Sequence, residues 1–132
     1  MALLVPDEGE VELLSLSLNK VAQADVKLHL YTNDYTPVEG SNVAAFTECV
    51  AAGYAAITLT GTDWTIATAT GTTTAEQPQK TFTLTAASTN YGYYVTNGAG
   101  TKVLWAERFS DAPHTIPSGG GTEKITVKIQ GE

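Results

Sequence analysis

The two histidines are the first residues to weigh as chemical groups, because imidazole is a common metal ligand and general base. His29 and His114 lie far apart in the chain, and neither belongs to a recognisable metal-ligand spacing. Ser110, Asp111 and His114 supply the residue types of a catalytic triad within one short stretch. That stretch also holds Pro113, and Ser, Asp and Pro are typical of a turn for backbone reasons. We therefore expect neither a metal site nor a triad.

Two carboxylates come next, since a pair of acids held a few ångströms apart can hydrolyse a glycosidic bond. Strand-like sequence surrounds Asp63 and Glu107, although Asp63 also follows a Gly-Thr turn signal. The glycine-rich run 118–121 lacks the lysine and the following helix of a phosphate-binding loop. The sequence thus predicts no enzyme, no cofactor and no metal.

Aromatic side chains offer a different chemistry, the stacking of sugar rings. Tyr91, Tyr93, Tyr94 or Trp64 could form such a platform in a carbohydrate-binding module. Aromatic residues are equally favoured in cores and at protein interfaces. Core or interface packing is the preferred interpretation, and the carbohydrate-binding alternative stays open.

The elements that must position these groups are strands. Apolar residues recur with a period of two at 26–31, 64–66, 81–85, 91–96 and 124–129, the pattern of strands with one buried face. Asn97–Gly100 and Ser118–Gly121 predict tight turns, and residues 32–43 and 68–79 predict longer loops, with the Thr-rich stretch 68–74 a mobile one. About seven to nine strands within residues 26–132 predict an all-β domain, an antiparallel β-sandwich with jelly-roll-like topology.

Residues 1–25 form a separate N-terminal arm or short helix. Asp7 followed by an acid three residues later resembles a capping box, and a helix is predicted over 8–20. Val11, Leu14, Leu18 and Val21 repeat at helical spacing along it. The apolar start 3–5 is too short to build a core, so we expect it to dock on a partner protein.

Residues 101–109 combine apolar side chains with three charged ones. Strict alternation places Val103, Trp105 and Phe109 on one face together with Glu107, whereas Arg108 points to the other. A strand that is apolar on both faces is either central in a sandwich or covered by a neighbouring subunit. A central strand is the preferred interpretation, and a subunit contact through Glu107 or Arg108 is the alternative.

Charge and cysteine content narrow the class of partner. The 132 residues carry a net charge of -7, which disfavours nucleic acid and anionic membranes as partners. Residues 1–50 hold eight acids and two bases, a net of -6, so a partner of this third is expected to be basic.

The single Cys49 cannot form an intrachain disulfide. The opening MALLVPDEGEVELL lacks the basic region of a signal peptide, and no apolar run matches a membrane span.

Three stretches of the chain are distinctive: MALLVPDEGEVELL at the start, GYAAITLTGTDWT at 53–65, and the long run from YGYYV to ITVKI at 91–129. They resemble a group of small structural proteins of tailed bacteriophages. The longest motif of that group is LLWAERF, which stands here as VLWAERF at 103–109. The resemblance covers most of the chain and is weakest at 32–50 and 68–80.

The resemblance implies a capsid decoration (cement) protein, which binds the outer capsid surface as a homotrimer and stabilises the shell. Its partners would be the major capsid protein and further copies of itself. It would be made in the host cytoplasm and end on the capsid surface of the virion. A tail-fibre or tail-adaptor component is the alternative. The residues expected to contact the capsid or another subunit are Leu3, Leu4, Val5, Val11, Leu14, Trp105, Glu107, Arg108 and Phe109.

Overall fold

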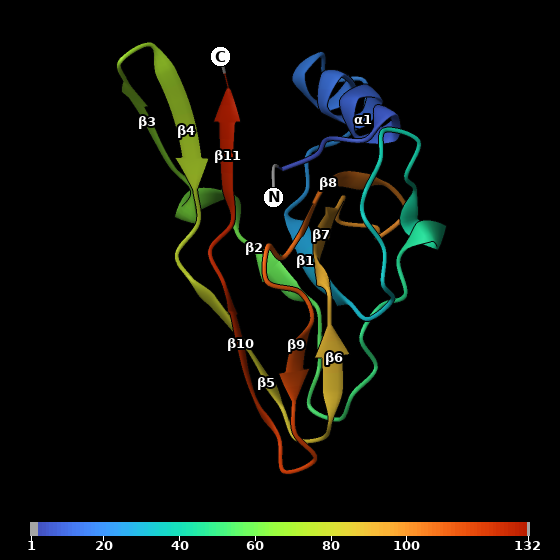
Figure 1. Cartoon of the computed structure of the whole chain (residues 1–132). Coiled ribbons are helices and arrows are strands. Elements are labelled where there is room, and N and C mark those ends of the chain that lie inside the picture. The colour runs from blue at the N-terminus through green and yellow to red at the C-terminus, as the bar shows by residue number, and fades with distance from the viewer. Residues whose placement is uncertain (1–2, 132) are drawn as a thin grey trace.

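The computed structural model describes residues 3–131, in which one helix is followed by eleven strands (Figure 1). All strand pairs are antiparallel, which confirms the predicted all-β, sandwich-like class. The elements are α1 Asp7–Ser17, β1 Val26–Tyr31, β2 Ile57–Leu59, β3 Thr65–Ala69, β4 Thr72–Glu76, β5 Lys80–Leu84, β6 Ser88–Asn90, β7 Gly92–Thr96, β8 Val103–Arg108, β9 His114–Ile116, β10 Gly121–Ile125 and β11 Lys128–Gly131, with short 3-10 turns at Val43–Ala45 and Gly61–Asp63.

The central sheet has the strand order β2-β1-β7-β8. The turn predicted from Asn97 to Gly100 joins β7 to β8, and the Gly100 N–H donates to the Asn97 carbonyl at 2.9 Å. The N-terminal segment extends the sheet past β8, because Leu4 and Ala106 exchange backbone hydrogen bonds of 2.9 and 2.8 Å. β6 and β9 prolong the β7–β8 hairpin as a second short ladder.

The second layer is a long antiparallel ribbon on one side of the central sheet (Figure 1). Its strands are β4 followed by β5, paired with β11 and β10 respectively. The Gln77 N–H donates to the Val127 carbonyl at 3.0 Å between the two ladders, so they continue into one another. β3 pairs with the open side of β4 and completes the layer. The jelly-roll strand order stays a prediction.

Both layers contribute apolar side chains to one core. On β5, Phe82 and Leu84 are buried whereas Thr81 and Thr83 are exposed, the alternation expected of a strand with one buried face. Each buried Leu or Phe stabilises the fold by about 1.5–3 kcal/mol. The buried members are Leu28, Leu30, Cys49, Leu59, Phe82, Leu84, Tyr93, Val95, Leu104, Trp105, Ile116, Ile125 and Val127.

A second apolar cluster covers the other face of the central sheet. Phe46, from the loop 32–47, stacks on Tyr94 of β7 with ring centroids 4.7 Å apart, and its edge meets Tyr31. Asn33 anchors this loop, because its amide donates to the Ala45 carbonyl and its oxygen accepts from the backbone of residue 47. The central strands are therefore apolar on both faces because the chain's own loop covers them.

A β-bulge changes the facing of β8. Val95 lies opposite Trp105 but Thr96 lies opposite Val103, so one extra residue is inserted at Leu104. Val103 consequently joins the cluster of Phe46 and leaves Trp105 on the other face. The prediction that Val103 and Trp105 share a face is wrong, because strict alternation does not survive an inserted residue.

Helix α1 is shorter than the predicted 8–20 and begins without a capping box. Pro6 is the N-cap residue and no side chain caps the helix, although acids in the first turn suit the helix dipole. The helix ends because Asn19 adopts a left-handed conformation with φ of 57°. The Lys20 N–H then donates to the Ser15 carbonyl at 2.8 Å and closes the last turn.

The Thr-rich stretch 68–74, predicted to be a mobile loop, belongs instead to the β3–β4 hairpin. Thr70 and Gly71 both have positive φ, 54° and 81°, and form its two-residue turn. The expectation that the strand at 64–66 buries one face is also wrong, since all five residues of β3 are exposed. Threonine favours β-structure, so a run of it can form a hairpin without a core beneath it.

Gly9 allows α1 to lie directly on β8. A β-carbon there would stand 2.7 Å from the Val103 carbonyl oxygen and closer still to that of Leu104. We expect Gly9→Ala to destabilise the protein by about 1–3 kcal/mol, despite the better helix propensity of alanine. Gly40→Ala is the matched control, because nothing lies within 4 Å of its added β-carbon. Urea unfolding of both variants checks this, and an unchanged Gly9→Ala protein would contradict it.

Candidate functional site

A buried hydrogen-bond chain links β1, β7 and the 48–54 loop. His29 Nδ1 lies 2.7 Å from Glu48 Oε1, and His29 Nε2 lies 2.9 Å from Thr96 Oγ1. The Tyr54 hydroxyl donates to the same Glu48 oxygen at 2.8 Å. Carboxylate, imidazole and hydroxyl thus follow one another in the order of an acid–base–nucleophile triad.

The burial of these side chains indicates that the hydrogen-bond chain stabilises the fold and does not act in catalysis. Thr96 is 1% exposed and His29 is 7% exposed, so a substrate cannot reach the hydroxyl. The imidazole also stacks on Tyr94 with centroids 4.7 Å apart. Burial, followed by the hydrogen bond to Glu48, raises the pKa of Tyr54, which keeps the phenol a donor. These hydrogen bonds give partners to polar groups that the sheet and its loop enclose.

His114 stands between two carboxylates. Its Nε2 lies 2.7 Å from Asp111 Oδ1 and its Nδ1 lies 2.8 Å from Glu123 Oε1, while the ring stacks on Phe109. Partial burial lowers the pKa of His114, but the hydrogen bonds to Asp111 and Glu123 outweigh it, and the net pKa is raised. The hydrogen bond to His114 lowers the pKa of Asp111. The imidazole ring thus bridges β9, β10 and the preceding turn.

Metal binding and triad chemistry find no support at these histidines. Each ring nitrogen of His114 already faces a carboxylate oxygen, at 2.8 and 2.7 Å. Within residues 3–131 no group of three His, Cys, Asp or Glu side chains could hold a metal ion. Ser110 makes no hydrogen bond with His114 in this part of the chain, so the residue types of 110–114 do not assemble into a triad.

The two predicted carboxylates have different partners. Asp63 faces Lys80 at 3.9 Å, whereas Glu107 accepts a hydrogen bond of 3.4 Å from the Tyr93 hydroxyl. Burial raises the pKa of Glu107, and the Tyr93 hydrogen bond opposes that rise. The structure gives this pair no common partner and no shared cleft.

The tyrosine platform for sugars is contradicted by burial. Tyr93 is 5% exposed and Tyr94 is 2% exposed, so neither ring face is open. Tyr91 lies beneath the Arg108 guanidinium, 5.2 Å from its ring centroid. Trp64 packs edge-on against Trp105, with centroids 6.2 Å apart. No exposed coplanar set remains among these four candidates.

The four interface candidates on and after β8 make contacts within the chain. Trp105 is 3% exposed in the core, and Phe109 packs on the core edge. Arg108 Nη1 lies 2.7 Å from Asp34 Oδ1 and donates to the Tyr35 carbonyl at 3.2 Å, which holds the loop 32–47. Glu107 pairs with a tyrosine of its own sheet, so its polar partner is also internal.

The N-terminal candidates divide into two groups. Leu3, Leu4 and Val5 are half-buried, and Leu3 and Val5 pack against the core beside β8. The edge of the chain's own sheet thus holds this segment, and its contact with a partner protein stays a prediction. Val11 and Leu14 are 65% and 63% exposed and have no such cover.

Helix α1 turns polar side chains toward the protein and large apolar side chains toward solvent, the reverse of a usual surface helix. Its inward side is polar, since Glu8 Oε1 accepts from the Val103 N–H at 2.7 Å and Glu12 accepts from the Asn97 amide at 3.3 Å. Its outward side carries large apolar side chains next to the exposed acids Asp7 and Glu10. Surface helices normally turn their apolar stripe to the core. We call the exposed set the α1 face; it consists of Val11, Leu13, Leu14 and Leu18, which are 65%, 38%, 63% and 70% exposed.

A groove runs beside this helix. It has a volume of about 150 Å³ and lies between Leu16, the segment 22–26 and the β7–β8 turn. Small apolar residues such as Ala22, Ala24 and Val26 line much of it. It could admit an apolar side chain of a docked protein alongside the α1 face.

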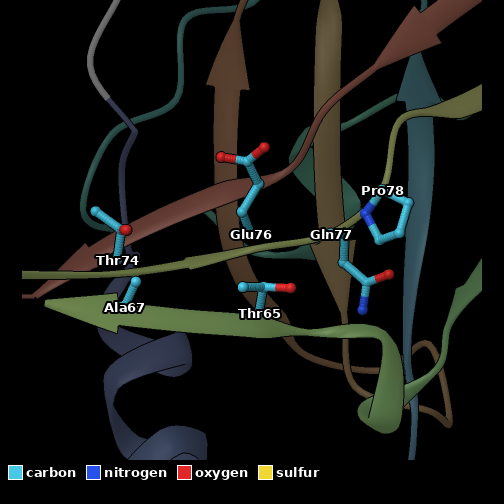
Figure 2. A pocket seen from close by; sticks show the side chains of 6 residues that line it. All are labelled: Thr65, Ala67, Thr74, Glu76, Gln77 and Pro78. Atoms are coloured by element: carbon cyan, nitrogen blue, oxygen red, sulfur yellow. The ribbon is translucent and has the colours of Figure 1, made fainter.

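A larger hollow of about 350 Å³ lies on one face of the β3–β4 hairpin (Figure 2). Gln77 is 1% exposed at its end, and its amide donates to the Thr60 carbonyl at 2.9 Å. Its carbonyl oxygen has no partner but is enclosed by protein, so no ligand can reach it. Glu76 stands near Lys128, at 3.9 Å. The remaining lining is threonine, alanine and Pro78, which gives no selective chemistry.

The chain matches no protein-family model, and neither the curated proteins nor the solved structures include a significant match. Within residues 3–131 there is no helix of the length and apolarity needed to cross a membrane.

Several of these partners were missed in the sequence. Glu48 and Thr96 lie 19 and 67 residues from His29, so no local spacing could reveal the buried chain. Asp111 and His114 are three residues apart, and that spacing was the available signal for their pairing. Glu123 reaches His114 from β10, nine residues further along the chain.

The buried chain predicts the effect of removing its hydroxyl. We expect Thr96→Val to destabilise the protein by about 1–3 kcal/mol, because His29 Nε2 loses its partner in a buried site. Thr83→Val on the exposed side of β5 is the control and should change the free energy of unfolding by less than about 0.5 kcal/mol. Chemical denaturation measures both, and equal effects would contradict the structural role.

The His114 cluster predicts a pH-dependent stability. Its folded-state pKa lies above the ordinary 6.5, so its contribution is complete below that pH and is lost as the pH rises through the folded-state value. Unfolding wild type and His114→Asn at about pH 6 and about pH 9 isolates this contribution. The stability difference between the two proteins should shrink by about 0.5–1 kcal/mol at the higher pH. A difference that grows with pH would contradict the bridge.

Proposed function

We propose that this chain is a non-enzymatic docking protein whose α1 face binds an apolar surface on another protein. The observation that supports this proposal is the exposure of the apolar side chains of α1. Three large side chains, Val11, Leu14 and Leu18, face solvent. Glu8 and Glu12 turn inward, where they accept hydrogen bonds from a backbone N–H and from a side-chain amide respectively. Contiguous exposed apolar residues on a helix are typical of helix-in-groove recognition.

Charge restricts the partner of this face. Asp7 and Glu10 are exposed on the same helix, and α1 contains no basic residue. A complementary surface would be an apolar groove with lysine or arginine at its rim. The same acids disfavour an anionic bilayer as the occupant. A basic-rimmed protein surface is therefore the partner that fits.

The resemblance to tailed-phage structural proteins supports a role in the virion. We propose a capsid decoration protein that attaches to the major capsid protein on the outer shell, with a tail-fibre or tail-adaptor role as the second candidate. Several copies, a homotrimer in the resembling group, would multiply modest contacts into firm attachment. The stiff two-layered body suits a part that must keep its shape while anchored.

Point substitutions test the docking face better than truncation, because deleting residues 1–20 would also remove the pairing of Leu4 with Ala106 and uncover the core. We expect Val11→Glu to weaken co-sedimentation with capsid shells of the same virus at least about tenfold, since a carboxylate would lose its hydration in an apolar contact. Val50→Glu is the matched control, because Val50 is 93% exposed and lies outside the helix.

Each outcome of this test is informative. Loss of binding by Val11→Glu alone, with unchanged circular dichroism, supports the α1 face. Equal binding by both variants would show that another surface docks. Antibody labelling of virions in the electron microscope separates the roles: label on heads supports decoration, label on tails supports the adaptor, and unlabelled particles overturn a virion role.

A further inference from the structure

The outer strand of the β3–β4 hairpin is an open sheet edge. The three-stranded sheet has the order β11-β4-β3, so β3 has a neighbour on one side only, and Figure 1 shows it on the outside of β4. All five of its residues are exposed, and Ile66 is 69% exposed. An edge of this kind presents unpaired backbone groups that can template another strand.

The hairpin register identifies which backbone groups point outward. Thr70 and Gly71 form a two-residue turn, so Ala69 and Thr72 are a hydrogen-bonded pair. Hydrogen-bonded pairs alternate along an antiparallel ladder, and Ala67 opposite Thr74 is the next one. The N–H and C=O groups of Ile66 and Thr68 therefore point away from β4 to the open edge.

This edge carries none of the usual protection against pairing. Natural edge strands are blunted by charges, prolines, bulges or covering segments. Residues 64–75 contain no charged residue and no proline, and the β3–β4 pairing has no register shift. The opposite edge of the same sheet, β11, carries Lys128, which is exposed. β3 is thus the unguarded side of the sheet.

We propose that β3 pairs with β3 of a second copy of this chain, antiparallel about a two-fold axis at Ala67. Ile66 would then exchange backbone hydrogen bonds with Thr68 of the partner subunit, and Thr68 would do the same with the partner's Ile66. The contact satisfies all four outward groups and joins two three-stranded sheets into one of six strands. It is isologous, because each copy contributes the same segment.

Charge and register select a second copy as the occupant. A chain of net charge -7 repels its own copies through most of its surface, and the uncharged edge is where two copies can approach. In the proposed register Asp63 falls opposite Gly71 of the partner subunit, at the turn, so no carboxylates meet. The contact goes beyond the proposed function and does not depend on it, since it uses neither α1 nor the shell.

Side chains add to this pairing on one face. Ile66, Ala75 and Ile129 occupy one row across β3, β4 and β11. The exposed Ile66 would end this row against Thr68 of the partner subunit and lose water-exposed apolar surface. Two five-residue strands bury less than the roughly 1,200 Å² of a stable interface, so the isolated dimer is expected to be weak and to form at high concentration.

A disulfide trap tests the two-fold register. Ala67 and the partner's Ala67 would be a directly opposed non-hydrogen-bonded pair, with Cα atoms about 4.5 Å apart, inside the range of about 4.4–6.8 Å that a disulfide spans. Ala67→Cys should therefore form a covalent dimer under mild oxidation. Thr73→Cys, exposed on the inner strand β4 of the same hairpin, is the matched control and should stay monomeric. The native Cys49 is 1% exposed and stays in both variants.

Two results would overturn the proposal. One is equal cross-linking of the two variants, and the other is no cross-linking of either variant at the high protein concentration used to detect the dimer by analytical ultracentrifugation. Ile66→Lys gives a second, non-covalent arm, because it places two like charges beside the axis. This substitution should lower the association constant of the dimer at least about tenfold. Thr73→Lys is its control. A ring closed through β3 and a different edge would leave Ala67→Cys uncross-linked and so also contradict the two-fold contact.

Discussion

The contact between the N-terminal segment and β8 sets the orientation of α1, and with it the surface that we propose for docking. Leu4 pairs with Ala106, Glu8 accepts from the Val103 N–H, and Gly9 lies against the β8 carbonyls. Together these contacts leave α1 one way to sit on the sheet. Because the glutamates occupy the inward side, the valine and leucines of the helix have to face water.

That orientation carries a cost which the rest of the molecule must offset. The exposed apolar surface on α1 does not stabilise the folded state of the isolated chain. That stabilisation comes from apolar surface buried in the core between the layers and beneath the loop 32–47. Polar groups enclosed by this packing are satisfied by the His29 chain and the His114 bridge. Groups that resemble catalytic machinery thus serve the closure of a small β domain.

Within residues 3–131, the α1 face and the β3 edge have no partner in the chain itself, and their chemistry differs. The α1 face is apolar and flanked by acids, which favours a different, basic protein. The β3 edge is uncharged and offers backbone groups, which favours a copy of the same strand. The two contacts that we propose use separate surfaces, so they could form together without competing, as the assembly role that we propose requires.

The residues themselves were enough to predict the all-β class, the buried alternation of Phe82 and Leu84, and the turn at Asn97, because each depends on neighbours two to four positions away. The helical spacing of Val11, Leu14 and Leu18 also predicted α1, but not that this stripe faces water. Local patterns say which side chains share a face and are silent on what covers it. The bulge at Leu104, the partners of His29 and the docking of residues 3–5 were decided only by tertiary structure, since each joins segments that sequence distance separates and packing brings together.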